Sequence, residues 1–332
     1  MDPGQLLKID DLKVSFFTHA GEVKAVRGVN LHLNKGDTLG IVGESGCGKS
    51  VTAQSIMKLI PSPPGRIVCG SINFAGVEIA TKTERAMQKI RGNDISMIFQ
   101  DPMTSLNPTM GIGRQIVEGL QLHQKMNADK ARKRTLELLG LVGIPNPEKC
   151  ITQYPYQLSG GMRQRVMIAI ALACEPKLLI ADEPTTALDV TIQAQILDLM
   201  KDLQKKLDTA IVLITHDLGV VAEVCDRVLV MYAGKVVEEG NIRDIFYHSQ
   251  HPYSWGLLKS VPRMDNEAKS NLVPINGQPP DLISPPKGCA FSPRCEKAMQ
   301  VCQQHQPEMF NIRDGHSAAC WLLDPRAKGV VS

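Results

Sequence analysis

The fold of this chain is decided by Leu39–Ser50, the stretch LGIVGESGCGKS. Its first four residues form an apolar run with the length of a strand that is buried on both faces. The last eight fit the pattern G-x-x-x-x-G-K-[ST], and a helix is expected to follow over Ser50–Leu59. A strand, a glycine-rich turn and a helix in this order predict a loop that binds phosphate.

The chemistry of this predicted phosphate loop follows from its residue types. Glycines let the backbone curl so that successive N–H groups point inward, and the helix N-terminus adds partial positive charge. The lysine can reach the β- and γ-phosphates of a nucleotide, and the final hydroxyl can bind Mg²⁺. The loop comprises Gly43, Glu44, Ser45, Gly46, Cys47, Gly48, Lys49 and Ser50.

A second apolar strand ends in two carboxylates, Asp182 and Glu183. Ligands of open parallel sheets collect at the carboxyl ends of the strands. We therefore expect Asp182 to hold Mg²⁺ through water, and Glu183 to act as a general base or to position the attacking water. Taken without the phosphate loop, the pair could equally be a strand end that turns to solvent.

Short apolar strands alternate with helices along most of the chain, which predicts an α/β fold with a mainly parallel sheet. These strands are expected at Leu39–Val42, Leu178–Ala181 and Ile211–Thr215. Leu7–Phe17 and Val23–Leu33 instead predict an antiparallel pair around a turn. A crowding of prolines between about 262 and 288 places a domain boundary near residue 260.

Composition narrows the class of protein. The 332 residues are 43% hydrophobic and 21% charged, which is typical of a globular chain. A net charge of +3 and an aromatic content of 4% give no argument for a nucleic-acid partner. No apolar run reaches the ~18 residues of a membrane span, and the N-terminus has no secretory signal pattern, so we expect a cytosolic location.

Nine cysteines in such a chain argue against a disulfide framework, and four of them gather in the last 44 residues. Four thiolates suit tetrahedral zinc or a four-iron cluster, and two nearby histidines could substitute as zinc ligands. Four reduced cysteines that only pack a small domain are the alternative. The residues concerned are Cys289, Cys295, Cys302 and Cys320, with His305 and His316. We expect this region to lie apart from the nucleotide motifs, so that a metal there would be structural.

A third motif, LSGGMRQR at Leu158–Arg165, lies between the phosphate loop and the carboxylate pair. Together the three motifs resemble the ATP-binding subunit of an ABC transporter. The resemblance implies an ABC-type ATPase over 1–260, with a mainly parallel core sheet, an antiparallel β subdomain and a helical subdomain at about 100–175. Residues 261–332 would be a proline-rich linker and a small Cys-rich extension.

The same resemblance implies a head-to-tail dimer that holds ATP and Mg²⁺ between one subunit's phosphate loop, with Val51, and the other subunit's Ser159, Gly160 and Gly161. These three residues would offer N–H groups at the start of the helix Met162–Ala173. A helix with an ordinary N-cap and a flexible glycine entry is the alternative.

Three single residues match further positions of the family. Gln100 resembles the glutamine that touches Mg²⁺ and the attacking water, and Asp189 resembles the aspartate that crosses the dimer interface. His216 resembles the histidine that contacts the γ-phosphate, although a lone histidine at a strand end is often a satisfied polar residue.

The residue that stacks on adenine is the least defined of these matches. Phe16 occupies roughly that place, where tyrosine is more usual. Phe16 or its neighbour Phe17 could equally belong to the strand core.

A narrower resemblance, to importers of oligopeptides, dipeptides and nickel, rests on three segments. They are QDPMTSLNP at Gln100–Pro108, His251–Tyr253, and the Cys-rich residues 261–332, called the tail below. It implies an ATPase that drives peptide import at the cytoplasmic face of the bacterial inner membrane. The expected partners are two transmembrane permease subunits, an extracytoplasmic peptide-binding protein reached through them, and a second ATPase subunit. A heterodimer is favoured over a homodimer, and the tail is expected to hold a [4Fe-4S] cluster, with zinc as the alternative.

Three rival functions remain open at this point. The chain could serve an importer of nickel or another small solute. It could be a soluble ABC ATPase that works on DNA or ribosomes, or a nucleotide-gated iron–sulfur regulator without a transport role.

Overall fold

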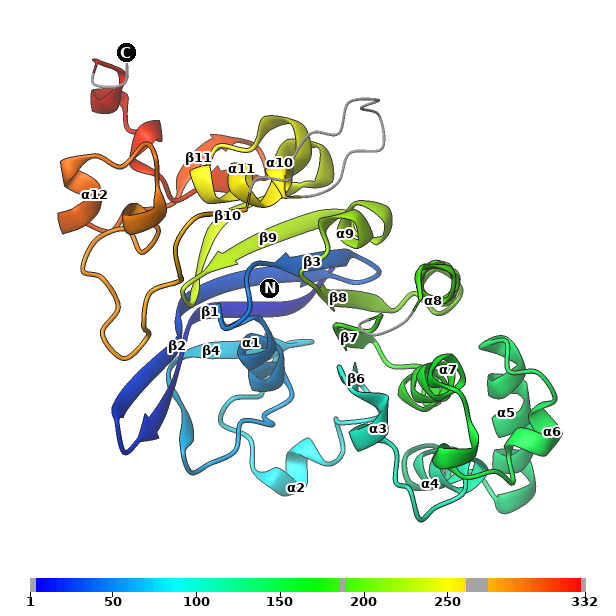
Figure 1. Ribbon diagram of the computed structural model, residues 1–332. Helices are drawn as coiled ribbons and strands as arrows, with labels where there is room; N and C mark the ends of the chain where they lie inside the picture. The colour runs from blue at the N-terminus through cyan, green and yellow to red at the C-terminus, as the bar shows by residue number, and fades with distance from the viewer. Residues whose placement is uncertain (1–3, 186–188, 261–273, 330–332) are drawn as a thin grey trace, which may run out of the picture. The chain divides into compact units, whose positions relative to one another are not determined.

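The computed structural model describes the chain except for residues 1–3, 186–188, 261–273 and 330–332 (Figure 1). Pro262 of the predicted linker and residues 187 and 188, before Asp189, lie outside the described residues. The chain divides into two compact units. Unit 1 contains Met1–Leu33, Thr38–Ala80 and Ile214–Ser332, and unit 2 contains Asn34–Asp37 and Thr81–Leu213.

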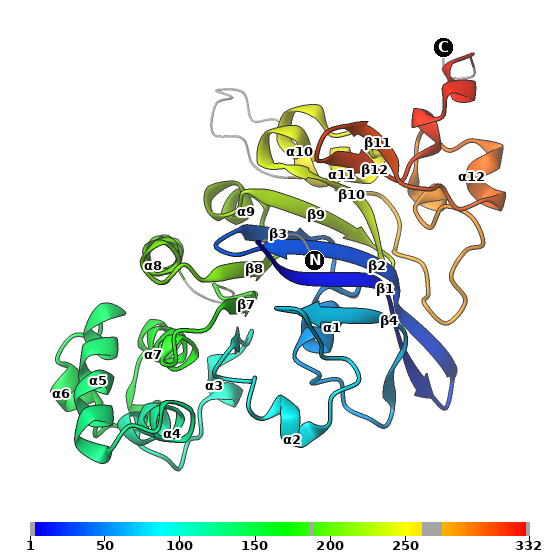
Figure 2. The same cartoon turned by 180° about the vertical axis from the view of Figure 1, so that it is seen from behind.

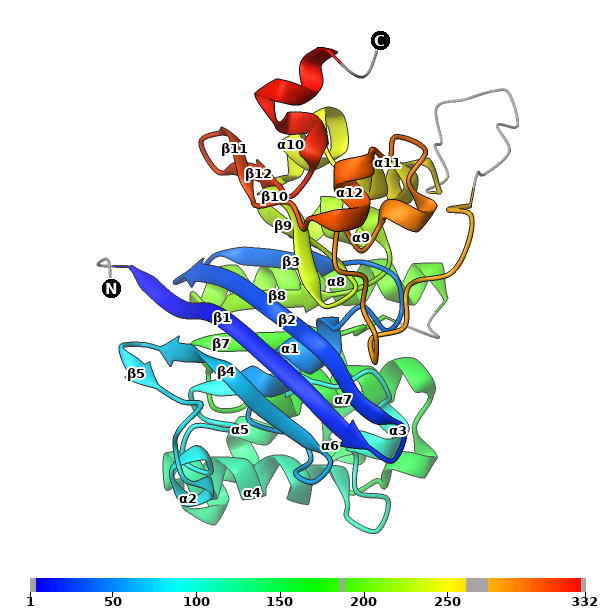
Figure 3. The same ribbon diagram turned by 90° about the vertical axis from the view of Figure 1, so that its left-hand side faces the viewer.

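Unit 1 begins with a sheet in the order β2-β1-β4-β5 (Figure 3). Its strands are β1 (Gln5–Thr18), β2 (Gly21–Asn34), β4 (Gly65–Phe74) and β5 (Val77–Glu78). β1 and β2 are hydrogen-bonded neighbours joined by a tight turn, as the predicted pair requires. In the second half of β2, buried Val29, Leu31 and Leu33 alternate with exposed residues, so one face of the strand packs on the core.

A second set of strands in unit 1 runs in the order β11-β12-β10-β9-β3. These strands are β3 (Thr38–Val42), β9 (Arg227–Tyr232), β10 (Lys235–Asn241), β11 (Phe310–Arg313) and β12 (His316–Ala318). β3 is buried throughout and pairs in parallel with β9, as its apolar sequence predicts. The helices α1 (Lys49–Ile56) and α9 (Leu218–Val224) follow the phosphate loop and His216 respectively.

The tail adds two strands, β11 and β12, to this sheet. β12 pairs antiparallel with β10, so that Glu238 lies opposite Ala318 (Figure 2). The fully buried side chains of Glu238 and His316 meet at 3.0 Å. The remaining elements here are α10 (Ile242–His248), α11 (Pro252–Lys259), η2 (Ser292–Arg294), α12 (Gln300–Gln304), η3 (Trp321–Leu323) and η4 (Pro325–Gly329). The predicted domain boundary near residue 260 is not tested by these contacts.

Unit 2 contains parallel strands and a group of helices (Figure 1). Its strands are β6 (Ile95–Ile98), β7 (Leu178–Asp182) and β8 (Ala210–Ile214). Its helices are α2 (Glu84–Met87), α3 (Pro102–Ser105), α4 (Ile112–Gln124), α5 (Ala128–Leu141), α6 (Pro147–Cys150), η1 (Pro155–Gln157), α7 (Gly160–Leu172) and α8 (Val190–Leu207). The helices α4, α5 and α7 pack on one another, which confirms the helical part of the predicted α/β fold.

A membrane span was not expected from the sequence. Within the described ranges, every helix is too short or too polar to cross a bilayer.

Candidate functional site

The phosphate loop lies between β3 and α1 in unit 1, and close backbone contacts fix its path. Gly43 has φ +152°, and a Cβ there would lie 2.2 Å from the carbonyl oxygen of Met231. Gly48 has φ +101°, and a Cβ there would lie 2.5 Å from the carbonyl oxygen of Ala25. Any larger residue would clash with this neighbouring backbone, so the two glycines allow the curled conformation that the motif predicts.

Lys49 folds back over the loop and is only 6% exposed. Its Nζ donates hydrogen bonds to the carbonyl oxygens of Gly43 (2.7 Å) and Glu44 (3.0 Å). The N-cap of α1 is Gly48, which makes no side-chain capping bond, and half-buried Ser50 and Val51 occupy the first turn. The first N–H groups of α1 therefore donate no hydrogen bond to a capping side chain. Together with the nearby ammonium group, they favour an anion at this position.

Glu44, the second residue of the loop, is held by side chains from distant parts of unit 1. Its carboxylate accepts two hydrogen bonds from Arg294, Nη1 to Oε2 at 2.6 Å and Nη2 to Oε1 at 2.8 Å. Its backbone N–H donates to the hydroxyl of Tyr253 at 2.8 Å. The expectation that the tail lies apart from the nucleotide motifs is therefore wrong, because Arg294 directly precedes Cys295.

In unit 2, the parallel pairing of β6 with β7 brings Gln100 to the carboxylate pair. Ile98 lies opposite Ala181, so the residues that follow both strands emerge at the same edge. The Nε2 of Gln100 donates to Oε2 of Glu183 at 2.7 Å. Asp182 is 5% exposed at the end of β7. The structure thus joins Gln100 and Glu183, two of the four residues that were predicted to act on Mg²⁺ or on the attacking water.

Glu183 adopts a backbone conformation that side chains seldom take. Its φ is +48°, in the left-handed region, directly after a buried strand. This turn bends the chain out of β7 and is stabilised by Gln164, whose Nε2 donates to the carbonyl oxygen of Pro184 at 2.5 Å. Conformations of this kind cost ~1–3 kcal/mol and cluster at active sites, where the surrounding structure imposes them.

His216 is exposed and follows Thr215, the residue directly after β8. The backbone N–H of Thr215 donates to the carbonyl oxygen of Ile41 at 3.3 Å. The Oγ1 of Thr215 accepts from the N–H of Asp217, which in turn caps α9. Both neighbours of the histidine are therefore held, Thr215 by the backbone of β3 and Asp217 by Thr215 and by its role as the cap of α9.

The two predicted dimer contacts of unit 2 are helix caps in this chain. Ser159 caps α7 by accepting from the N–H of Met162 at 3.3 Å, and Asp189 caps α8 by accepting from the N–H of Ile192 at 2.9 Å. Both cap residues and Gly160 are exposed. A Cβ on Gly161 would lie 3.1 Å from Ile192, so that glycine lets α7 start close to α8. The capped-helix alternative thus describes the local structure and leaves the helix tip accessible.

Phe16 lies in β1 opposite Gly65 of β4 and is half-buried. Phe17 is 50% exposed. Neither belongs to the buried core, and a role for Phe16 in adenine stacking stays a prediction.

The four cysteines of the tail line one cavity of about 10 Å³. Burial raises the pKa of the Cys289 and Cys295 thiols and raises the pKa of Cys320 to about 12, which favours the protonated form. In the described part of the chain, no three His, Cys, Asp or Glu side chains are arranged so that they could hold a metal. His316 pairs with Glu238 and does not line the cysteine cavity. The predicted metal centre is therefore not confirmed by this arrangement.

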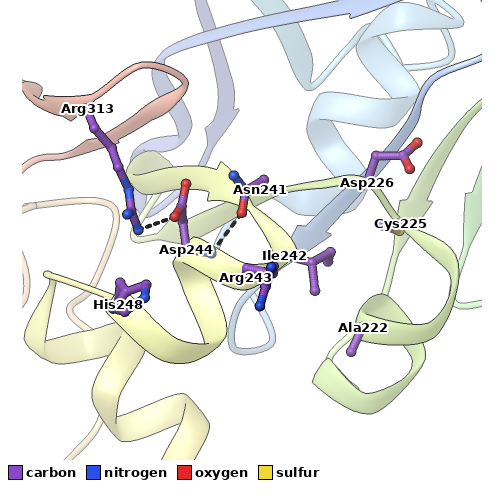
Figure 4. Close-up of a pocket in the computed structure, with 9 residues that line it drawn as sticks. All are labelled: Ala222, Cys225, Asp226, Asn241, Ile242, Arg243, Asp244, His248 and Arg313. Atoms are coloured by element: carbon purple, nitrogen blue, oxygen red, sulfur yellow. Dashed lines mark hydrogen bonds and ion pairs between the residues drawn. The ribbon is translucent and has the colours of Figure 1, made fainter.

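A pocket of about 570 Å³ lies where the tail meets α10 (Figure 4). Arg313 of β11 forms an ion pair with Asp244, and Asn241 caps α10 by accepting from the N–H of Asp244 at 2.8 Å. The pocket is lined by residues of both charges and includes none of the nucleotide motifs.

Other proteins are similar in sequence to this chain over nearly its whole length. The ABC transporter family matches residues 26–186. The oligopeptide transport ATP-binding protein OppD of Bacillus subtilis is 60% identical over 326 residues, which are 98% of this chain and 91% of OppD. The chain belongs to the ABC transporter family. The dipeptide transport ATP-binding protein DppD of Bacillus subtilis is another relative in this family, 56% identical over 98% of the chain and 97% of DppD.

The tail and the fold agree with this membership. Residues 237–302 match the C-terminal region of oligopeptide/dipeptide transporters. The ATP-binding cassette MJ0796, solved as a dimer with ADP and Pi, has a TM-score of 0.65 and 28% identity over 72% of this chain and 99% of its own. The cbiO1 subunit from Clostridium perfringens has a TM-score of 0.63 and 30% identity over 74% of this chain and 92% of its own. The predicted ABC-type ATPase fold is confirmed, and the chain is an ABC ATPase.

Proposed function

We propose that this ABC ATPase powers import of dipeptides or oligopeptides across the bacterial inner membrane, working at the cytoplasmic face. The observation that carries the proposal is the 60% identity to an oligopeptide transport ATP-binding protein over 98% of the chain. The separate match of residues 237–302 to the oligopeptide/dipeptide C-terminal region supports peptides over nickel as cargo. Two permease subunits and an extracytoplasmic binding protein would complete the importer.

At the catalytic centre, Lys49 and the loop N–H groups bind the β- and γ-phosphates. Ser50 and Asp182 would hold Mg²⁺, which neutralises charge on the phosphates when it is bound. Glu183 orients the attacking water and accepts its proton, and the amide of Gln100 orients the Glu183 carboxylate through the 2.7 Å hydrogen bond. His216 contacts the γ-phosphate.

A second ATPase subunit, which we propose to be a different chain, completes each site with its own signature residues. Exposed Ser159 and Gly160 would reach across to the partner's nucleotide, and Asp189 would contact the partner. Bound ATP closes such a dimer, and loss of the γ-phosphate reopens it and moves the permease subunits.

Affinity purification from membranes tests the transport role. We expect the chain to bring down two integral membrane subunits and a second ATPase. Reconstituted in vesicles with the binding protein, the complex should hydrolyse ATP several-fold faster when peptide is present. Recovery of the chain with ribosomes or DNA and without membrane subunits would contradict the proposal. Stimulation by nickel and not by peptide would correct the cargo.

We also propose, from the resemblance of the tail, that Cys289, Cys295, Cys302 and Cys320 bind a structural [4Fe-4S] cluster, with zinc as the alternative. Their common cavity supports the proposal. As placed, the side chains do not form a ligand set. Loading would therefore require the thiols to lose protons and to reorient, as metal binding commonly does.

Metal analysis after anaerobic purification tests this assignment. We expect about four iron and four sulfide per chain, since four thiolates suit such a cluster. Cys302→Ser should lose most of the iron. Cys69→Ser, which changes an exposed cysteine far from the tail in sequence, should retain it. A protein with one equivalent of zinc and no iron would replace the cluster by the zinc alternative.

A further inference from the structure

The tail places one arginine directly on the phosphate loop. The side chain of Arg294 is 4% exposed, and each of its five N–H donors has an acceptor in unit 1. Two of them bind the Glu44 carboxylate at 2.6 and 2.8 Å. The others reach the carbonyl oxygens of Asn276 (2.9 Å) and Ile275 (3.1 Å) and the hydroxyl of Tyr232 (3.3 Å). Because all five N–H groups are hydrogen-bonded, the guanidinium is held in one orientation.

Aromatic rings support this orientation. The guanidinium carbon of Arg294 lies 5.8 Å from the ring centre of Tyr232 and 6.0 Å from that of Phe291. Tyr232 packs against Tyr253 at 4.6 Å and against Phe291 at 5.3 Å between ring centres. Tyr253 is the residue whose hydroxyl accepts from the backbone of Glu44. The side chain and the backbone of Glu44 are thus held by one buried cluster.

The position of Glu44 makes this contact relevant to the nucleotide. Glu44 is the only acidic residue of Gly43–Ser50, a loop whose expected ligand is a polyanion. Its side chain is 25% exposed, and its backbone carbonyl oxygen accepts from the ammonium group of Lys49 at 3.0 Å. An unpaired carboxylate on this loop would repel the triphosphate, because like charges repel one another more strongly in a partly buried site than in water.

We propose that Arg294 is a positioning residue of the nucleotide site, which neutralises Glu44 and fixes the start of the phosphate loop for ATP. The proposal rests on the ATP-binding role proposed for that loop. It makes the tail a working part of the nucleotide site, in addition to its packing against β10.

Equilibrium dialysis of the full-length chain against Mg-ATP tests the proposal. We expect Arg294→Ala to raise the Kd for ATP by about 10-fold, since it removes a charge-assisted bidentate pair and leaves a carboxylate on the loop. In the reconstituted complex, KM for ATP should rise by a similar factor while kcat changes less than about 2-fold, because Arg294 does not touch the reacting atoms.

A second substitution separates charge from packing. Glu44→Gln in the Arg294→Ala background should bring the Kd back to within about 3-fold of the parent value, since the repelling charge is gone. Arg313→Ala breaks another ion pair of the tail, with Asp244, and should leave the Kd unchanged. If Arg294→Ala unfolds, Arg294→Gln takes its place. The Kd for ATP is then compared between Arg294→Gln and the double variant with Glu44→Gln.

The Kd values of these variants either support or overturn the role of Arg294. A parent-like Kd for folded Arg294→Ala, or a double variant as weak as the single one, would overturn the role of Arg294. A 10-fold loss with recovery supports it. Failure of the transport proposal is distinguishable, because it would appear as an absence of peptide stimulation in the parent complex, whereas the Kd comparison uses this chain alone.

Discussion

Glu183→Gln is expected to bind ATP with the parent affinity and to hydrolyse it about 1000-fold more slowly, in the range that loss of a general base causes. Glutamine has the shape of glutamate and can still bond with Gln100, so the 2.7 Å contact and the strained turn should persist. An amide cannot accept the proton of the attacking water. The chemical step should therefore fail while the phosphate loop keeps its ligand.

Single-turnover hydrolysis in the reconstituted complex measures this effect. Dialysis with Mg-ATP reports binding separately. Glu137→Gln is the matched control, because it makes the same chemical change on the exposed face of α5, where Glu137 pairs with Arg134. The control should hydrolyse ATP at the parent rate. Parent-rate turnover by Glu183→Gln would show that another group activates the water.

Lys49→Ala should weaken ATP binding itself, by about 100-fold or more, which corresponds to ~2.7 kcal/mol. The ammonium group is the one cation of Gly43–Ser50, and it is held inside the loop by the carbonyl oxygens of Gly43 and Glu44. Its loss leaves the loop with two carbonyl oxygens that have lost their donor and with no positively charged side chain to attract the phosphates. Hydrogen bonds to charged groups in such sites are among the strongest in proteins.

The measurement is again the Kd for Mg-ATP of the full-length chain. Lys35→Ala, at an exposed position just before β3, removes the same charge elsewhere in the chain and should not change the Kd. Thermal unfolding should show that both variants are folded. An unchanged Kd for folded Lys49→Ala would mean that ATP binds elsewhere, and the assignment of the phosphate loop would be wrong.

The residues that the sequence predicted well lie in short continuous stretches. Gly43–Ser50 and Leu158–Arg165 carry their conformational requirements within a few positions, through glycines and a helix start, to which Gly43–Ser50 adds a preceding strand. β3 and β7 were predicted within one residue, because burial on both faces leaves an uninterrupted apolar run. The approach of Gln100 to Glu183 follows from parallel strands ending together.

Contacts between distant segments were not predictable in this way. Arg294 and Glu44 are 250 residues apart, and neither has a local pattern that points to the other. Tyr253 belongs to a stretch that resembles peptide importers, yet nothing in that stretch shows that its hydroxyl reaches the phosphate loop. The cysteine spacing predicted that four sulfurs gather, and the four cysteines line one cavity, but the spacing could not choose between a metal centre and reduced thiols.

The strand β12 is only three residues long, too short for any periodicity to reveal it. Its backbone nevertheless covers the outer side of β10, with the N–H of Ala319 bonded to the carbonyl oxygen of Val237 at 2.8 Å. An uncovered sheet margin offers open donors and acceptors to other chains and promotes aggregation. A shortened chain that kept every nucleotide motif but ended before β12 would expose this edge of β10. We therefore expect such a chain to aggregate more readily than the full-length protein.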